Sequence, residues 1–159
     1  MNTDEIVKNL KKCSLFKHLD DIELDTLTGL CTLEEYRAGE TIYSQGQHGD
    51  RLYILSKGRV SFHRSYKLHN SRTADAVVFI LRETENRRLF GGWCALVEAE
   101  HIFMCSAKCD KDSRIVVFDS KHIRKLMADN PDIHIKILET LVLILRGRLE
   151  SSYDSFESV

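Results

Sequence analysis

Cysteine thiols are candidate ligands for a metal ion, and two of the cysteines, Cys105 and Cys109, lie four positions apart. On an extended strand four residues span about 13 Å. Two sulfurs that share one Zn²⁺ at about 2.3 Å each cannot be that far apart. The sequence also lacks a CxxC pair, so this spacing predicts no metal site.

Nucleophilic and phosphate-transferring sites are not indicated either. The sequence has no Gly-x-Ser-x-Gly turn and no phosphate loop of the Gly-x-x-x-x-Gly-Lys-Ser/Thr type. Asp112 and Asp119 stand at opposite ends of a predicted strand, a placement that suits turns better than acid/base chemistry. We therefore expect that the protein is not an enzyme.

The elements that would position any site follow from the spacing of apolar residues. Residues 3–13 have a helical period, and a second helix is predicted from Asp20 or Asp21 to about Gly29. From Cys31 the period changes to two, which predicts short strands at 41–43, 52–55, 59–63, 76–81, 102–107 and 115–118. A polar stretch at 64–75 is predicted to be a hairpin loop.

The helical period returns after Phe118. Ser120 is the predicted cap of one helix, and Asn130 is the predicted cap of a second helix that begins at Pro131. The sequence thus predicts one domain, mainly β with flanking helices: a helical segment 1–30, a β-roll 31–119, C-terminal helices 120–150 and a tail 151–159.

The last helix carries two adjacent apolar faces. One follows a 3,4,3,4 spacing through Ile135, Leu138, Val142, Leu145 and Leu149, and the other holds Ile133, Ile137, Leu141 and Ile144. Such a wide apolar arc needs two neighbours. We expect the β-roll on one side and a second copy of the helix on the other, which predicts a homodimer; the alternative is a helix buried wholly within its own monomer.

Length, charge and cysteine content limit the setting of the protein. The chain has 159 residues, which suffices for one domain with a single core. Charged residues make up 30% and sum to a net charge of −1, so no overall field attracts nucleic acid or acidic lipid. Without a signal-peptide core or a long apolar run, and with five scattered cysteines, we expect free thiols, a cytoplasmic location and no membrane contact.

The order of elements, together with one glycine-punctuated stretch, resembles the cyclic nucleotide-binding domain family of catabolite activator-type regulators, cyclic nucleotide-dependent kinases and gated channels. The resemblance covers about residues 10–150 and is most specific over residues 36–60, with Gly39, Gly46, Gly49 and Gly58 at predicted corners. It implies a double-stranded β-helix, or jelly-roll barrel, with N-terminal helices and a long C-terminal helix. It also implies a pocket for a cyclic nucleotide.

In that family a Phe-Gly-Glu stretch leads into a short helix whose N–H groups hold the phosphate. The glutamate accepts from the ribose, and an arginine pairs with the phosphate. Here the glutamate position falls on Gly92 or Trp93, and the arginine position on His101, Ile102 or Phe103. The resemblance implies a ligand-binding set of Arg88, Phe90, Gly91, Gly92, Trp93, Cys94, Ala95 and His101.

Both charged ligand partners of the family pattern are therefore missing. A hydrogen bond to a charged group contributes about 1.5 to 3 kcal/mol, so the lost arginine alone predicts a roughly ten- to hundredfold weaker affinity for a cyclic nucleotide. Two rescue routes remain, an anion nest of backbone N–H groups at Gly91, Gly92 and Trp93, and arginines that reach back, such as Arg88. Arg87 and Arg88 otherwise form a solvated turn.

The sequence thus predicts a regulatory sensor module that transmits its signal through the C-terminal helix and has weakened or altered cyclic nucleotide recognition. The candidate ligands are cyclic AMP, cyclic GMP or another small anion. One alternative is a ligand-free scaffold whose pocket Trp93 fills, and another is a haem sensor that uses one of the seven histidines. Only nine residues follow Glu150, so we expect no DNA-binding domain in this chain.

Overall fold

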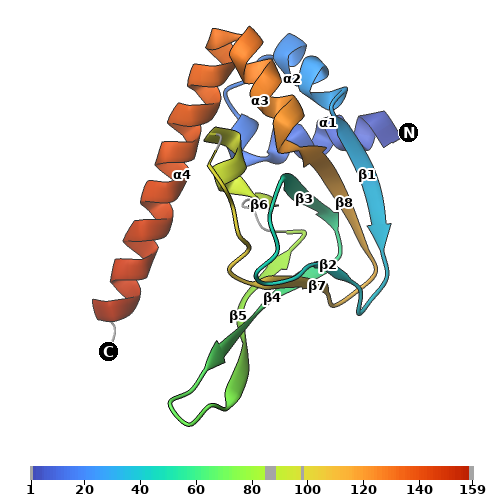
Figure 1. Ribbon diagram of the computed structural model, residues 1–159. Coiled ribbons are helices and arrows are strands. Elements are labelled where there is room, and N and C mark those ends of the chain that lie inside the picture. Colours follow the sequence, from blue (N-terminus) through green and yellow to red (C-terminus); the bar gives the residue numbers. More distant parts are fainter. Residues whose placement is uncertain (1, 85–88, 98, 158–159) are drawn as a thin grey trace.

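The computed structural model describes residues 2–84, 89–97 and 99–157 (Figure 1). Three short helical segments come first: α1 (Asn2–Lys12), the 3₁₀ turn η1 (Ser14–Phe16) and α2 (Asp21–Thr28). The strands follow, with a second 3₁₀ segment, η2 (Trp93–Val97), before the last two of them. Helices α3 (Ser120–Asp129) and α4 (Pro131–Glu157) end the described chain, which confirms the predicted order of elements.

The strands form two antiparallel sheets. The first has the order β1-β8-β3-β6 and the second the order β2-β7-β4-β5. Their bounds are β1 Cys31–Tyr36, β2 Thr41–Tyr43, β3 Arg51–Lys57, β4 Arg59–Lys67, β5 Thr73–Arg82, β6 Leu89–Gly91, β7 Ser106–Cys109 and β8 Ser113–Asp119. This confirms the mainly β jelly-roll architecture with flanking helices that the sequence predicted.

Strands β3 and β8 of the first sheet are buried on both faces. Leu52 and Ile54 of β3 belong to the core beneath the helices, whereas Tyr53 and Leu55 of the same strand belong to the core between the sheets. Strand β8 alternates in the same way, because successive side chains of a strand point to opposite faces. This explains why the apolar runs 52–55 and 115–118 have no polar positions.

Helix caps agree with the predictions in part. Asp20 is the cap of α2: its side chain accepts from the Glu23 N–H, and the Glu23 carboxylate accepts from the Asp20 N–H. The cap of α3 is Asp119, which accepts from the Lys121 N–H, so Ser120 is the first helical residue and the predicted Ser120 cap is wrong.

Helix α4 is longer than the sequence predicted. It runs to Glu157, so most of the stretch 151–159 that we assigned to a tail is helical. Leu149, Tyr153 and Phe156 continue the helical spacing, which explains the extension. In the part of the chain that is described, no helix is both long and apolar enough to cross a lipid bilayer.

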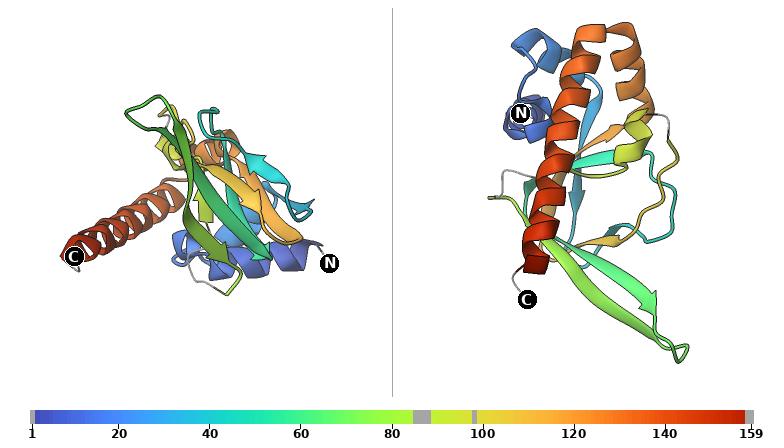
Figure 2. Two further views of the ribbon diagram at one scale, coloured as in Figure 1. Left: turned by 90° about the horizontal axis from the view of Figure 1, so that it is seen from below. Right: turned by 90° about the vertical axis from the view of Figure 1, so that its left-hand side faces the viewer.

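Two predicted strand boundaries also differ. The run 102–107 contributes only Ser106 and Ala107 to β7, and Ile102 makes an isolated bridge with His48. The hairpin loop predicted at 64–75 is a tight turn at 68–72, closed by the Leu68 N–H on the Arg72 carbonyl at 2.7 Å. The longer strands β4 and β5 form a hairpin that projects from the body of the molecule (Figures 1 and 2).

The glycines of residues 36–60 act in two ways. Gly39, Gly46 and Gly58 have positive φ, which suits tight corners between strands. Gly49 does not, but a Cβ there would lie 2.7 Å from the Phe103 Cζ atom. Gly49 therefore allows a close approach between the β2–β3 connection and the segment before β7.

Candidate functional site

Strand β6 brings the predicted phosphate-binding segment, residues 90–97, to the edge of the first sheet. This stretch is called the phosphate segment below. Phe90 pairs with Tyr53 in the β3–β6 register, and their rings stack with centroids 5.2 Å apart. Phe90 is buried and also contacts Phe62 edge-on, at 5.4 Å between centroids. The aromatic side chain thus anchors the start of the segment in the core between the sheets.

Gly91 and Gly92 lie against the backbone of residues 49–51. Gly91 has a φ of +109°, and a Cβ there would lie 2.7 Å from the Arg51 carbonyl oxygen. The Gly92 N–H donates to that same oxygen at 2.9 Å, and a Cβ on Gly92 would lie 2.6 Å from the Gly49 carbonyl oxygen. The Gly92 N–H is therefore engaged within the protein, and the position has no room for a side chain.

His101 approaches the same loop from the other side. The Gly49 N–H donates to the His101 carbonyl at 2.7 Å, and the imidazole contacts the Phe103 ring edge-on at 5.3 Å. Burial lowers the pKa of His101 below its ordinary value. His101, one of the three positions to which the resemblance assigns the family's arginine, thus carries an imidazole that favours its neutral form.

Phe90, Gly91 and His101 border a cavity of about 940 Å³ between the second sheet, residues 90–97 and α4. Aromatic side chains dominate its lining, and the Tyr43 and Phe103 rings stack at 3.8 Å between centroids. The described lining residues are Tyr43, Phe62, Val78, Phe79, Leu81, Thr84, Leu89, Phe90, Gly91, Trp93, His101, Phe103, Met104, Cys105, Arg148, Ser151 and Ser152. Its size fits a small-molecule ligand.

Helix α4 reaches this cavity through Arg148. The guanidinium carbon of Arg148 lies 4.8 Å from the centroid of the Trp93 ring, a cation–π contact. Trp93 is the first residue of η2, so the contact joins α4 to the phosphate segment. Figure 1 shows α4 passing η2 and continuing toward the level of β5.

The structure brings four of the predicted ligand-binding residues together. Phe90, Gly91, Trp93 and His101 line the cavity. Gly92, Cys94 and Ala95 are not among its described lining residues: Cys94 is exposed, and the Ala95 carbonyl accepts from the Arg124 guanidinium at 3.2 Å. Arg88 lies outside the described residues.

The sequence prediction missed Arg148, Ser151 and Ser152 as lining residues. It placed Arg148 on the last helix without assigning it to the site, and it ended that helix at residue 150, before the two serines. The apolar spacing that continues from Leu149 to Tyr153 and Phe156 was the signal that could have placed them. Tyr43, Phe62 and Phe103 come from separate parts of the roll, and no local pattern indicates that they meet.

The predicted dimer face of α4 is largely exposed. The relative exposures of Ile135, Val142, Leu145 and Leu149 are 55%, 63%, 49% and 56%, while Leu138 is half-buried against the core. The adjacent face is different, since Ile133, Ile137 and Leu141 are buried. One side of the helix therefore packs on its own domain and the other leaves an apolar stripe uncovered.

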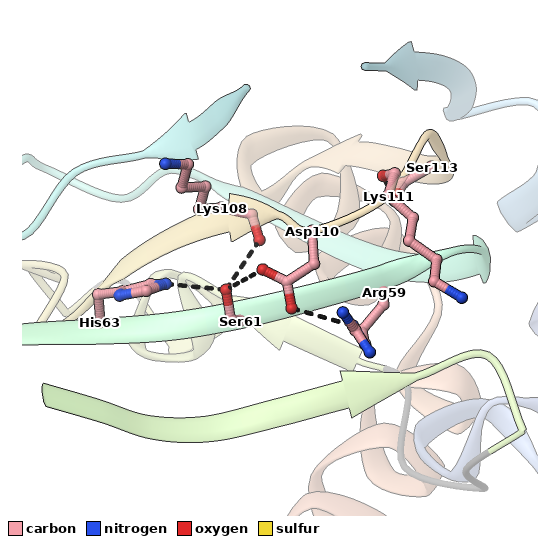
Figure 3. A network of polar contacts seen from close by, with 7 residues as sticks. All are labelled: Arg59, Ser61, His63, Lys108, Asp110, Lys111 and Ser113. Carbon is pink, nitrogen blue, oxygen red and sulfur yellow. Dashed lines mark hydrogen bonds and ion pairs between the residues drawn. The ribbon is translucent and has the colours of Figure 1, made fainter. Parts of the chain in front are cut away.

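A separate polar cluster joins β4 to β7 (Figure 3). Ser61 donates to an Asp110 oxygen at 2.6 Å and lies 2.8 Å from the His63 Nε2 atom, and the other Asp110 oxygen accepts from Arg59 at 3.0 Å. Because the Ser61 proton goes to Asp110, the His63 nitrogen donates to Ser61 rather than receiving its proton. This arrangement differs from a catalytic triad, in which histidine takes the serine proton.

A metal site is not indicated in the described ranges 2–84, 89–97 and 99–157. No group of three or more metal-ligating side chains occurs among those residues. His48 instead pairs with Glu100, with 3.0 Å between the His48 Nδ1 and the Glu100 Oε1 atoms.

Comparisons with known proteins bear on the fold and the site. The family model described as "Cyclic nucleotide-binding domain" matches residues 33–130. A CRP-like cAMP-activated global transcriptional regulator from Mycobacterium tuberculosis is 27% identical over 143 residues, which cover 90% of this chain and 58% of the regulator. A cGMP-dependent protein kinase from Plasmodium berghei is 33% identical over 60 residues, which cover 38% of this chain and 7% of the kinase.

The chain thus spans little more than half of the regulator and a small part of the kinase. Among solved structures, a cyclic nucleotide-binding domain from Methylobacillus flagellatus superposes with a TM-score of 0.75 at 18% identity. The superposition covers 96% of this chain and 81% of that domain. At this identity it supports the fold alone.

Proposed function

Because the chain belongs to the cyclic nucleotide-binding domain family, we propose that it is a non-enzymatic sensor domain in which recognition of cyclic AMP and cyclic GMP is weakened. The relatives named above are activated or controlled by cyclic nucleotides according to their names, which makes these ligands the first to test. The proposal concerns the ligand-binding segment of this chain and its departure from the family pattern.

The observation that carries the proposal is the packing of Gly92. Its N–H is bound to the Arg51 carbonyl, and the Gly49 carbonyl occupies the space that a side chain would need. Position 92 therefore offers no ribose acceptor, and the phosphate loses one N–H donor unless this loop moves. His101 adds to the loss, because burial favours its neutral form at one of the three positions to which the resemblance assigns the family's arginine.

Calorimetric titration of the chain with cyclic AMP and with cyclic GMP tests the proposal. We expect dissociation constants well above micromolar. The variant His101→Arg should bind cyclic AMP about ten- to a hundredfold more tightly, because a hydrogen bond to a charged group contributes about 1.5 to 3 kcal/mol. The control His122→Arg makes the same charge change at an exposed position of α3. Micromolar or tighter binding by the unmodified chain would refute the proposal.

The signal is proposed to pass through α3 and α4. Both helices contact η2, since Arg124 of α3 donates to the Ala95 carbonyl and Arg148 of α4 lies over Trp93. A ligand that rearranges η2 would change both contacts. The ligand shifts the helices from one arrangement to another only if the protein binds it more tightly in the second arrangement than in the first.

Two alternatives remain testable with the same protein. A scaffold with a plugged pocket is less well supported, since Trp93 borders a cavity of about 940 Å³ and leaves that space open. A thermal-shift panel of nucleotides and anions separates sensor from scaffold, because a ligand that binds the folded state raises Tm.

A haem sensor would use His101, the described histidine in the cavity lining, and would show a Soret band.

The apolar stripe of α4 is proposed as a dimer seam for a second copy of this chain. Its members are Ile135, Leu138, Val142, Leu145 and Leu149, and their 3,4,3,4 spacing is the pattern with which two helices pair. The exposure of four of the five residues supports this, because large uncovered apolar surfaces are rare on monomers.

A further inference from the structure

Strand β5 lies at the edge of the second sheet. It runs from Thr73 to Arg82, and among the described residues β4 is the only strand that it pairs with. An edge strand offers backbone N–H and C=O groups to a further strand, and proteins usually shield such edges with charged side chains. Between its first and last residues β5 has one charged side chain, that of Asp75. The edge is therefore weakly shielded.

Three consecutive apolar residues of β5 are exposed. The relative exposures of Val77, Val78 and Phe79 are 53%, 51% and 52%. Phe79 lies on the face of the core between the sheets, where its ring is 5.8 Å from that of Phe62 between centroids. Val77 pairs with His63, the residue after Phe62, and so lies on the other face. A flat surface covers one of these faces, whereas a strand beside β5 has neighbours on both.

A β-bulge divides this edge into two stretches. Val78 is an extra residue in β5, since its neighbours Val77 and Phe79 pair with consecutive residues of β4. The stretch Thr73–Val77 is regular and belongs to the hairpin that projects from the body of the molecule (Figures 1 and 2). Five residues are a usual strand length. This stretch is therefore the part of the edge that suits a further strand.

The β4–β5 hairpin is basic, whereas the rest of the chain is acidic. Residues 59–82 contain five arginines and lysines against one aspartate, a net charge of +4. Since the whole chain sums to −1, the remaining residues carry −5. Arg64, Lys67 and Arg72 are exposed, and within the described ranges no carboxylate forms an ion pair with them. The hairpin therefore favours a negatively charged partner.

These three cations lie close to the regular stretch of the edge. Arg64 and Lys67 belong to the part of β4 that pairs with it, and Arg72 directly precedes it. Neighbouring strands are about 4.8 Å apart, so a strand added to β5 would lie about 10 Å from β4. This separation is close to the Debye length of about 10 Å at 0.1 M salt, and long side chains shorten it. Carboxylates on an added strand would thus be attracted.

We propose that the edge of β5 at Thr73–Val77 binds an extended, acidic segment of a partner protein that also contains β-branched apolar residues. The segment adds a strand to the second sheet, its carboxylates meet the cations of the hairpin, and its apolar side chains cover Val77–Phe79. A second copy of β5 fits less well, because it brings together two hairpins of net charge +4. The inference goes beyond the proposed function, since it concerns a protein partner and not the ligand.

Two dye-labelled peptides of eight residues test this inference. One alternates glutamate with valine, and the other has lysine in place of each glutamate. Fluorescence anisotropy measures their dissociation constants for the unmodified chain. We expect the acidic peptide to bind at least tenfold more tightly than the basic one, with an affinity that falls as salt rises. Equal affinities, or no binding of the acidic peptide, would overturn the inference.

Reversing charges on the hairpin tests where the acidic peptide binds. The double variant Lys67→Glu with Arg72→Glu should weaken the acidic peptide at least tenfold and strengthen the basic one. The control Lys8→Glu with Lys12→Glu makes the same change at exposed positions of α1 and should leave both affinities within twofold. If the two double variants have equal effects, the attraction comes from net charge alone and the inference is wrong.

Hydrogen–deuterium exchange tests pairing through the backbone. In the presence of the acidic peptide, the amides of residues 73–77 that point away from β4 should exchange more slowly, because an added strand accepts from them. Unchanged exchange of this stretch would overturn strand addition, even if the affinities followed charge.

Two other occupants of the edge would give different results. With Leu145→Glu in the α4 stripe, a molecular mass that rises with protein concentration and falls on Lys67→Glu with Arg72→Glu would assign the edge to a second copy. Binding of the hairpin to phosphatidylserine vesicles that the acidic peptide does not inhibit would assign it to a membrane surface. Either result would overturn the inference.

Discussion

Gly49 and Gly92 touch through their backbones, and a Cβ on Gly92 would lie 2.6 Å from the Gly49 carbonyl oxygen. The same Cβ would lie 3.2 Å from the Arg51 carbonyl, to which the Gly92 N–H is bonded. Residues 49–51 thus close over Gly92, one of the two positions to which the resemblance assigns the family's glutamate. The departure from the family pattern involves two segments, not one side chain.

This contact predicts that restoring a side chain at position 92 destabilises the fold. Gly92→Ala and Gly92→Glu should each cost about 1–3 kcal/mol, as expected for overpacking against backbone. Thermal unfolding measures this as a lower Tm, by about 2–4 °C per kcal/mol for a chain of this size. The control Gly29→Ala meets only the Thr26 carbonyl at 3.5 Å and should change Tm little. An unchanged Tm for Gly92→Glu would mean that residues 49–51 move aside readily.

The stripe on α4 predicts that Leu145→Glu produces a monomer. In a dimer of this variant the two glutamates would face each other across the seam. The dimer would lose the apolar surface that the leucines bury, and the two carboxylates would repel each other. Size-exclusion chromatography with light scattering measures the mass in solution. The matched control is Leu143→Glu, an exposed leucine on another face of the same helix, which should remain a dimer. If the unmodified chain is already a monomer, the seam proposal is wrong.

Cysteine reactivity should follow burial. Desolvation, with a smaller contribution from nearby Cys13, raises the pKa of Cys31 to about 12. Because the thiolate is the reactive form, iodoacetamide at pH 8 should modify exposed Cys94 first and Cys31 only on unfolding. Peptide mass spectrometry of timed samples gives the order. Equal rates for Cys31 and Cys94 in the folded protein would contradict the burial of Cys31.

Stability should decrease on mild acidification because of His101. Its pKa is lowered by burial, so the unfolded chain binds more protons than the folded chain as the pH falls from about 6.5 through the folded-state pKa. The free energy of unfolding falls across that window and is unaffected by this group above it. His101→Gln should remove this part of the pH dependence in urea unfolding.

Nuclear magnetic resonance titration of the His101 ring provides an independent check. Its midpoint should lie below that of the same histidine in the urea-unfolded chain. A midpoint at or above the unfolded value would contradict the burial of the imidazole beside Phe103.

The sequence predicted those elements that have a regular apolar period. The stripes of α1 and α4 and the runs 52–55 and 115–118 identified helices and buried strands, because each has one or two faces in a core. Strand β6 was not predicted, since three residues that end in glycine have no period to detect. Tertiary pairing with β3 holds them in a strand.

The sequence predicted only those residues of the candidate site that lie in or close to one stretch of the chain. Phe90, Gly91, Trp93 and His101 were expected together and do line the cavity. The stacked pair Tyr43 and Phe103 depends on the strand order of the two sheets, which no local pattern contains. Asp119 is the cap of α3 in place of Ser120 because its side chain, one position earlier, accepts from the Lys121 N–H.

Strands β3 and β8 separate the two hydrophobic cores as a partition that has no free face. Close packing on both sides leaves such a layer little freedom to deform. We therefore expect that a change inside the roll reaches the helical layer around the rim of this partition, where residues 93–97 meet α3 and α4. A chemical crosslink between Trp93–Val97 and α4 would then silence the module while leaving both cores intact.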